Sequence, residues 1–379
     1  MDLVATKTYP SERRPIRHLD PVLLLDVFAL AVVGLFMVYS ATHQSLSAVG
    51  LDPGTFLKKQ VTFVALGSVM VLLAASFDYR FLKVYAGLIY AASLVLLVLV
   101  GSPLGTSVKG SQRWFQLFGF QFAPSEIAKL ALIIMLATFL SELRSGDLTL
   151  QEVYRATAIA AVPGVLVFLQ PDLGTSIVLV TILVGVLVVA GARARYLGIL
   201  ALTAVVLIFG AFQMGLVRDY QVNRLTSFLD PQNDPLRSGY NRKQAEIAIG
   251  SGGLFGVGYL QGTQTNLDFV PEQHADFIFT VVGEEFGFAG AFTLLVLFGV
   301  LIWRAFRIAL LSKDPFGTYV AAGIGSYLAI QMFVNIGMTL GIMPITGIPL
   351  PFVSYGGSAL LTNSAAVGLL LNIHMRRLK

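Results

Sequence analysis

Stretches of apolar residues long enough to cross a lipid bilayer recur along almost the whole chain. They lie near residues 22–41, 61–77, 84–101, 125–141, 156–170, 174–191, 196–216, 276–303, 317–340 and 355–374. About 20 helical residues, rising roughly 1.5 Å each, span the hydrocarbon core of a membrane. The fifth and sixth stretches are parted only by "LQPDLGT". The sequence therefore predicts an all-α, polytopic integral membrane protein with about ten transmembrane helices.

The composition supports a membrane protein and excludes some functions. Hydrophobic residues make up 56% of the 379 residues and charged residues only 12%, whereas soluble domains carry about a quarter charged residues. The net charge of +5 is explained by basic residues at cytoplasmic helix ends, so we expect no nucleic acid partner. Because the chain has no cysteine, disulfides and cysteine-based metal sites or nucleophiles are excluded.

The distribution of lysine and arginine between the loops predicts the orientation. With the N-terminus inside, sixteen of the 26 basic residues fall on the cytoplasmic side and nine on the outer side, and Lys129 lies inside a span. Five of the nine outer charges lie in one long loop, where the positive-inside rule counts least. We therefore expect both termini in the cytoplasm, a cytoplasmic tail over residues 1–20 and a large extracytoplasmic loop over residues 217–275. The chain, residues 1–379, is expected to form a single membrane domain.

The long outer loop contains a pattern that indicates partial order. In "SGYNRKQAEIAIGSGGLFGVG" a short amphipathic helix pattern is followed by closely spaced glycines. Long loops without secondary structure of their own are usually functional or disordered. We expect this loop to be partly folded.

Five carboxylates and a histidine surround the start of the eighth apolar stretch, in "DFVPEQHADFIFTVVGEEFG", residues 268–287. A helix over residues 276–303 would be about 42 Å long, so Asp276 lies at the outer interface, either as a helix N-cap or as the working residue of a site at the water boundary. Glu284 is about 80° further round that helix and about 12 Å deeper, and Glu285 points the opposite way from Asp276. We expect the two glutamates to face neighbouring helices, so the three carboxylates do not form one metal cage.

Glu126 and Lys129 form a second polar constellation at the start of the fourth span. Their spacing of three residues places them on adjoining faces of a helix. A charge inside a span costs about 2.5–3.5 kcal/mol on insertion scales, so it needs a partner or water. The pair is either a local ion pair that holds the helix, or Lys129 faces a polar cavity and Glu126 tunes it.

Four further residues in outer polar motifs are candidates for binding a substrate. Arg113, beside a tryptophan, is either an interfacial anchor or a phosphate-binding group. Asp172 lies in "QPDLGT", and a tight turn explains it equally well. Ser354 and Tyr355 belong to "PITGIPLPFVSYGGSA", residues 344–359, whose prolines and glycines favour a cavity wall over a capped loop. The histidines lack metal-ligand spacing, and no phosphate-binding loop or nucleophile elbow is present.

Several motifs together carry a resemblance to a known family. They are "SVKGSQRWFQLFGFQFAPSEIAKLALI", "QPDLGTS", the stretch from "LDPQNDPLRSGYNRKQ" to "HADFIFTVVGEEFGF", and "PITGIPLPFVSYGGSALLTN". With these motifs the chain resembles the shape, elongation, division and sporulation (SEDS) family from about residue 20 to the C-terminus. Within that family, "GYLQGTQ" followed by "FVPEQHADFIF" is more similar to the members that act in cell elongation than to those that act in division.

This resemblance implies a peptidoglycan glycosyltransferase with ten spans. Such enzymes polymerise lipid II, a disaccharide-pentapeptide on undecaprenyl pyrophosphate, at the outer face of the bacterial cytoplasmic membrane. The implied partners are a class B penicillin-binding protein, which crosslinks the strands, and other membrane proteins of the elongation complex. The family's essential aspartate matches Asp276, its loop arginine matches Arg113, and its charged pair matches Glu126 and Lys129. Some division members have a lysine before "SYGGS" where this chain has Thr346, so no role of that lysine carries over.

Glycosyl transfer needs a more nucleophilic sugar hydroxyl and a more stable pyrophosphate leaving group. A carboxylate at the interface, Asp276, either takes the acceptor's proton, which is worth about 10²–10⁴ in rate, or holds a divalent cation such as Mg²⁺ or Mn²⁺. The sequence does not decide whether a metal binds. Arg113 and Lys129 are the candidates for stabilising the departing anion.

Two alternatives to a polymerase stay open. A lipid II flippase, a transporter of lipid-linked precursor, would also have ten spans and intramembrane charges. Its ionisable groups should extend through the full depth of the membrane, whereas the polar motifs here gather on the outer side. A scaffold would bind the crosslinking partner, and strand synthesis would then not depend on Asp276.

Overall fold

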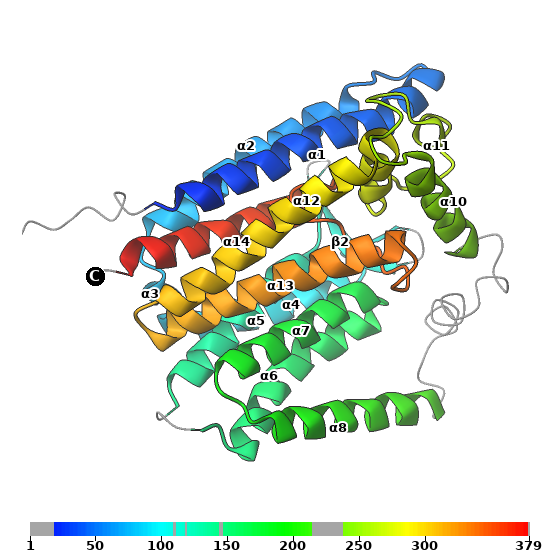
Figure 1. Ribbon diagram of the computed structural model, residues 1–379. Helices are drawn as coiled ribbons and strands as arrows, with labels where there is room; N and C mark the ends of the chain where they lie inside the picture. The colour runs from blue at the N-terminus through cyan, green and yellow to red at the C-terminus, as the bar shows by residue number, and fades with distance from the viewer. Residues whose placement is uncertain (1–18, 109–110, 118–119, 144–146, 214–237, 378–379) are drawn as a thin grey trace, which may run out of the picture.

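The computed structural model of this chain describes residues 19–377, except for 109–110, 118–119, 144–146 and 214–237. Its long helices lie side by side in one bundle (Figure 1). The helices are α1 (Pro21–Ala48), α2 (Thr55–Ser76), α3 (Arg80–Val84), α4 (Ala86–Val100), α5 (Pro124–Ser141), α6 (Leu150–Leu169), α7 (Leu173–Val189), α8 (Ala194–Gln213), α10 (Ser238–Ser251), α11 (Thr263–Asn266), α12 (Ile278–Leu311), α13 (Pro315–Thr339) and α14 (Gly357–Arg376). The strands are β1 (Thr106–Val108), β2 (Ser111–Leu117) and β3 (Phe120–Phe122).

All ten apolar stretches expected from the sequence form helices in their described residues, and the multi-pass membrane architecture is confirmed; residues 214–216, the end of the seventh stretch, lie outside the described part. Among the described residues, the helices long and apolar enough to cross a membrane are α1, α2, α5, α6, α12, α13 and α14. Shorter apolar helices are α4, α7 and the part Ala194–Val206 of α8. Residues 170–172 separate α6 from α7. The fifth and sixth expected spans, which only "LQPDLGT" parts, are therefore two helices.

Polar residues determine where several of these helices begin. Asp20 caps α1 by accepting a hydrogen bond of 3.2 Å from the amide three residues on, and Pro21 occupies the first helical position. Asp314 and Pro315 do the same for α13, with a cap hydrogen bond of 2.8 Å. Such caps satisfy amides that have no partner within the helix, and removing one costs about 1 kcal/mol.

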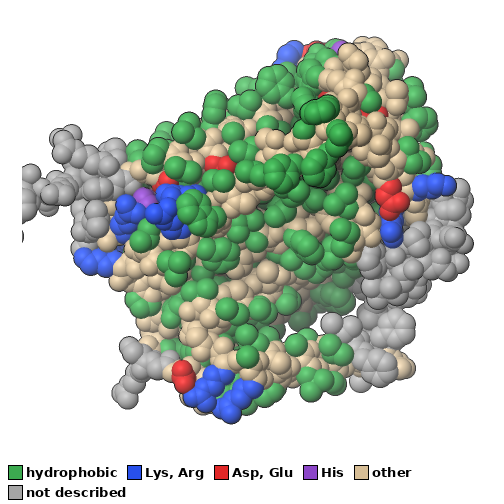
Figure 2. All heavy atoms as spheres, viewed as in Figure 1, with side chains coloured by type: hydrophobic (Ala, Val, Ile, Leu, Met, Phe, Trp, Pro, Cys, Tyr) green, Lys and Arg blue, Asp and Glu red, His purple; other side chains and the backbone are tan. Residues whose placement is uncertain are grey.

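The centre of the bundle is formed by α5, α13 and α14. Within their apolar windows 72%, 78% and 89% of residues are buried, against 17% for α2, which identifies α2 as a peripheral helix. Peripheral helices present apolar side chains outward, such as Leu72 of α2 and Val165 of α6. Figure 2 shows hydrophobic side chains over the middle of one face and Lys and Arg side chains toward its ends. This pattern suits a bundle whose middle is solvated by lipid and whose ends meet water.

A small antiparallel sheet departs from the expected all-helical architecture. β2 pairs with both β1 and β3, with Thr106 opposite Trp114 and Phe115 opposite Phe122. β1 and β3 have only three residues each, and the seven residues of β2 do not alternate between polar and apolar, so no strand pattern marks them in the sequence. The spanning part of the fold is all-α, and the sheet carries Arg113 on β2.

Helix α12 continues beyond its expected end at residue 303 and reaches Leu311. Its last turns contain Arg304 and Arg307, two of the sixteen basic residues assigned to the cytoplasmic side. The Arg304 guanidinium forms a buried ion pair with Asp20 at the start of α1. The guanidinium carbon of Arg307 lies 5.1 Å from the centre of the Trp303 ring. Both charges are therefore accommodated within the helix, Arg304 by a carboxylate distant in the sequence and Arg307 by a neighbouring aromatic ring.

Helix α12 is interrupted at Gly287, where φ is 63° and ψ is −157°. A glycine-rich segment, residues 252–258, packs against this break. Hydrogen bonds of 2.9–3.1 Å join the segment to both sides of the break: Val257 N to Glu284 O, Gly258 N to Glu285 O, Phe288 N to Gly253 O, and Ala289 N to Leu254 O. They satisfy backbone groups that the break would otherwise leave without partners, which is a requirement near a membrane. The described part of the long loop, with α10 and α11, is therefore ordered, as its sequence pattern indicated.

Candidate active site

The polar motifs recognised in the sequence meet at one end of the bundle. The start of α12, the end of α13, the starts of α7 and α14 and the small sheet all lie at this end (Figure 1). The chain between α13 and α14, residues 340–356, runs among them as an irregular segment. We call it the 340–356 loop.

Asp276 lies in the turn that precedes α12. The N-cap residue of α12 is Phe277, one residue after Asp276, so Asp276 is not the N-cap of this helix. The amide of Asp276 donates to the carbonyl of Glu272 at 3.0 Å, and the residue is partly exposed. A Cβ placed on Gly347, where φ is +73°, would lie 3.2 Å from Oδ2 of Asp276. The carboxylate therefore lies against the backbone of the 340–356 loop.

Asn335, near the end of α13, joins the Asp276 turn to this loop. Its Nδ2 donates to the carbonyl oxygen of Asp276 at 2.9 Å and to that of Ile348 at 2.7 Å, and the residue is fully buried. A second tie is the hydrogen bond of 2.9 Å from the amide of Tyr355 to the carbonyl of His274. Sequence reasoning missed Asn335, although a polar residue within an apolar span was an available signal.

Ser354 and Tyr355 stabilise the conformation of the 340–356 loop. The Ser354 hydroxyl accepts a hydrogen bond of 2.9 Å from the amide of Leu350, and its carbonyl accepts one of 3.3 Å from Gln60 of α2. The Tyr355 ring packs edge-on against Phe56, with ring centres 4.9 Å apart. Burial raises the pKa of the Tyr355 phenol above its ordinary value, so the hydroxyl is protonated at neutral pH. Direct contact of either side chain with substrate stays a prediction.

Arg113 and Asp172 are brought together from β2 and the start of α7. A guanidinium nitrogen of Arg113 lies 3.3 Å from Oδ1 of Asp172, and both side chains are largely buried. Asp172 also caps α7 by accepting a hydrogen bond of 3.1 Å from the amide of Thr175. Next to it, a Cβ on Gly174 would lie 2.5 Å from the side chain of Ile348. The start of α7 thus packs against the same loop that contacts Asp276.

Glu126 and Lys129 form an ion pair inside the bundle. Nζ of Lys129 lies 2.8 Å from Oε2 of Glu126, although this oxygen has no hydrogen bond of favourable geometry. Lys129 is 1% exposed, and its ammonium lies 5.1 Å from the centre of the Tyr327 ring of α13. The local ion pair is therefore present, and a role of Lys129 in a polar cavity stays a prediction.

A line of buried polar residues on α13 connects this ion pair with the Asp276 turn. Tyr327, Gln331 and Asn335 follow one another at intervals of four residues, so they lie on one face of the helix. The Tyr327 hydroxyl and both polar atoms of the Gln331 side chain have no hydrogen-bond partner among the described residues. Buried polar groups are normally hydrogen-bonded, so this face of α13 is a polar stripe within the apolar bundle.

The two glutamates of α12 bind different neighbours. Glu285 accepts hydrogen bonds from the hydroxyl of Ser40 on α1 and, at 3.1 Å, from the amide of Leu260. It therefore faces a neighbouring helix, as expected. Glu284 accepts hydrogen bonds of 2.7 and 3.0 Å from the amides of residues 264 and 265 in α11. In the part of the chain that the structure describes, no three His, Cys, Asp or Glu side chains gather as a metal site.

The chain is similar to known proteins over nearly its whole length. The model of the FtsW/RodA/SpoVE family, described as cell cycle protein, matches residues 21–379. The peptidoglycan glycosyltransferase MrdB of Escherichia coli strain K12 is 39% identical over 360 residues, which are 95% of this chain and 94% of MrdB. A structure solved in a study of the structural coordination of polymerization and crosslinking by a peptidoglycan synthase complex has a TM-score of 0.80 and 32% identity, covering 95% of this chain and 99% of that one. The crystal structure of the rod shape determining protein RodA of Thermus thermophilus has a TM-score of 0.69 and 31% identity, over 95% and 98% of the two chains.

Proposed function

This chain belongs to the FtsW/RodA/SpoVE family of cell cycle proteins, and we propose that it is a peptidoglycan glycosyltransferase that polymerises lipid II during cell-wall elongation and the maintenance of cell shape. The observation that carries this proposal is the 39% identity to a peptidoglycan glycosyltransferase along 95% of the chain. Similarity to a rod shape determining protein supports elongation over division.

Asp276 is the proposed general base. Its carboxylate takes the proton from a sugar hydroxyl of the acceptor as that oxygen bonds to the anomeric carbon of the donor, and the donor's bond to pyrophosphate breaks. The turn that carries Asp276 is held by Asn335 on one side and by the Glu272 carbonyl on the other. Such fixed placement supports catalysis, because effective proton transfer requires a base within hydrogen-bond reach of the reacting group.

Arg113 is the proposed ligand of the departing pyrophosphate. A guanidinium presents a planar fork of donors that matches phosphate oxygens. Asp172, 3.3 Å away, orients that fork and is a positioning residue in this proposal. For Glu126 and Lys129 we propose that the pair holds α5 against α13, because Lys129 is buried against Tyr327.

A divalent cation, Mg²⁺ or Mn²⁺, is the alternative role for the Asp276 carboxylate. Mg²⁺ is commonly held by one or two carboxylates together with substrate phosphates, and the single carboxylate of Asp276 fits that pattern. When bound, the cation would supply charge stabilisation to the departing pyrophosphate. Chelation of divalent cations before the polymerisation assay distinguishes the two roles, since a general base retains its activity.

The Asp276 end of the bundle is proposed to face outward from the bacterial cytoplasmic membrane. The excess of basic residues in the loops at the opposite end supports this orientation through the positive-inside rule. A class B penicillin-binding protein is the proposed partner, because a similar structure comes from a complex in which polymerization and crosslinking are coordinated. The partner and other elongation-complex membrane proteins would meet the lipid-facing helices.

Purified full-length protein incubated with lipid II tests this function. We expect glycan strands from the wild type, and none above background from Asp276→Asn, which removes the charge and preserves the shape. The matched control is Asp268→Asn, because Asp268 lies in the same acidic segment but is exposed. Its φ of 54° is one that asparagine tolerates.

Two results would contradict the proposal. Translocation of lipid II across vesicle membranes without any polymer would identify the flippase alternative. Full polymerisation by Asp276→Asn, with wild-type folding, would remove Asp276 from the mechanism and leave the glycosyltransferase assignment to the similarity alone.

A further inference from the structure

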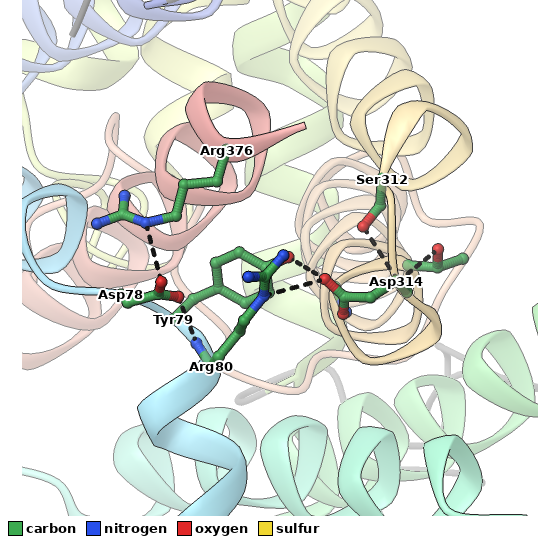
Figure 3. A network of polar contacts seen from close by, with 8 residues as sticks. Asp78, Tyr79, Arg80, Ser312, Asp314 and Arg376 are labelled. Atoms are coloured by element: carbon green, nitrogen blue, oxygen red, sulfur yellow. Dashed lines mark hydrogen bonds and ion pairs between the residues drawn. The ribbon is translucent and has the colours of Figure 1, made fainter. Parts of the chain in front are cut away.

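A polar network occupies the end of the bundle opposite Asp276. It contains Asp78 and Tyr79, which lie between α2 and α3, and Arg80, the first residue of α3 (Figure 3). These residues meet Asp314 before α13 and Arg376 at the end of α14. The Tyr79 hydroxyl donates to the Asp314 carboxylate. Nε of Arg376 lies 3.5 Å from Asp78, and Nε of Arg80 lies 3.7 Å from Asp314. The network joins α3, α13 and α14 where the apolar helices end.

A pocket of about 220 Å³ opens beside this network. Its walls come from α3, the last residue of α5 and the first turn of α13. The lining residues are Arg80, Lys83, Ser141, Asp314, Pro315 and Phe316. The pocket therefore lies between helices, at the end of the bundle opposite the Asp276 turn.

The two basic residues of the pocket are only loosely paired with carboxylates. Nζ of Lys83 lies 3.9 Å from Glu142, whose side chain is 62% exposed, and Arg80 is 3.7 Å from Asp314. These separations exceed hydrogen-bond distance. Asp314 already accepts hydrogen bonds from Tyr79 and, at 2.8 Å, from the amide of Gly317. Arg80 also contacts Tyr79. An arginine has five N–H donors and a lysine three, so the pocket still retains cationic donors for a ligand.

Apolar side chains alternate with these cations on α3. Phe81 and Val84 are 62% and 76% exposed and follow Arg80 and Lys83 directly in the sequence. Leu310 in the last turn of α12 is exposed as well. The pocket thus lies where an apolar surface meets basic donors, and a ligand that combines a phosphate with hydrocarbon chains matches both parts.

We propose that this pocket binds the phosphodiester headgroup of an anionic phospholipid, with Arg80 and Lys83 as its ligands and the acyl chains along α3. Basic pockets between membrane helices bind such headgroups. Arginine offers a bidentate fork to the phosphate, and lysine adds a point charge. The site is separate from the glycosyltransferase site and requires only that this end meets a membrane surface.

Native mass spectrometry of the full chain in detergent, with dioleoylphosphatidylglycerol or dioleoylphosphatidylcholine added, tests the proposal. We expect the wild type to bind the anionic lipid about tenfold more tightly, the effect of about one charged hydrogen bond. Arg80→Gln/Lys83→Gln should lose this preference. Lys83→Gln alone should weaken it while leaving the Tyr79–Asp314 hydrogen bond intact, so a folded variant is available if the double variant misfolds.

The matched control is Arg193→Gln/Arg195→Gln, which removes two exposed basic residues from the α7–α8 turn at the same end of the bundle. It should keep the preference for the anionic lipid. An equal loss in this control would mean diffuse attraction to negative charge and would overturn the site. Unchanged binding by the Arg80/Lys83 variants would also overturn it. Displacement of the lipid by millimolar sodium phosphate, with equal thermal stabilisation by phosphate alone, would identify free phosphate as the ligand and reject the lipid.

Discussion

Asn335 holds Asp276 through the backbone. Its Nδ2 donates to the carbonyl oxygen of Asp276 at 2.9 Å and to that of Ile348 at 2.7 Å. One buried amide therefore sets the distance between the turn that carries the carboxylate and the loop against which the carboxylate lies. The position of the proposed base depends on a residue from a different helix.

Asn335→Ala should lower the rate of lipid II polymerisation at saturating substrate by about 10- to 100-fold, because a small displacement of a catalytic group has effects of that size. KM should change little, since Asn335 is buried below the site. Steady-state kinetics with purified protein measure both quantities.

The control for this variant is Asn372→Ala. Asn372 of α14 is also fully buried, and its Nδ2 also donates to two carbonyl oxygens, those of Ala74 at 2.6 Å and of Phe77, but at the opposite end of the bundle. Both variants should lose similar stability, about 1–3 kcal/mol, yet only Asn335→Ala should lose activity per folded molecule. Equal losses of activity would show that Asn335 acts through stability alone.

Gly256→Ala should destabilise the protein more than Gly253→Ala does. Both glycines have positive φ, 81° and 54°, so alanine costs about 1–2 kcal/mol at either position. Only at Gly256 does a Cβ meet backbone, 2.1 Å from the carbonyl oxygen of Glu285, whereas nothing lies within 4 Å at Gly253. Denaturant unfolding in detergent compares them, and equal effects would mean that the contact at the α12 break yields easily.

Lys129→Met should destabilise the protein by about 3–5 kcal/mol, because it leaves the Glu126 carboxylate buried without its partner. The double variant Glu126→Gln/Lys129→Met should recover most of that loss, since it removes both charges. A double-mutant cycle measured by thermal unfolding gives the coupling. Absence of recovery would mean that Lys129 contributes mainly through its contact with Tyr327.

Asp172→Asn should separate the two contacts of Asp172. Asparagine caps helices as well as aspartate does, so the free energy of unfolding should change by less than about 1 kcal/mol. Removing the carboxylate that lies 3.3 Å from Arg113 should raise the KM for lipid II, because the guanidinium is no longer oriented toward phosphate. An unchanged KM would exclude Arg113 orientation as the function of this pair.

Most of the spanning architecture was predictable from local sequence. Runs of apolar residues identified the ten long apolar helices, including the pair parted at residues 170–172. Hydrophobicity and length are properties of each segment by itself. The end of α12 was predicted wrongly, since Arg304 is accommodated by Asp20, 284 residues away. The strands were missed because β1 and β3 have three residues each and β2 does not alternate polar and apolar residues.

The candidate site was predictable in its members and not in its arrangement. The motifs identified Asp276, Arg113 and Asp172 as polar residues at one side of the membrane, and hydropathy with charge distribution was enough for that. Only the tertiary structure decided that Asp276 is no helix cap, that Asp172 contacts Arg113, and that Asn335 joins the Asp276 turn to the 340–356 loop. These contacts join residues on different elements, and their geometry depends on how the helices pack, which no local pattern of residues encodes.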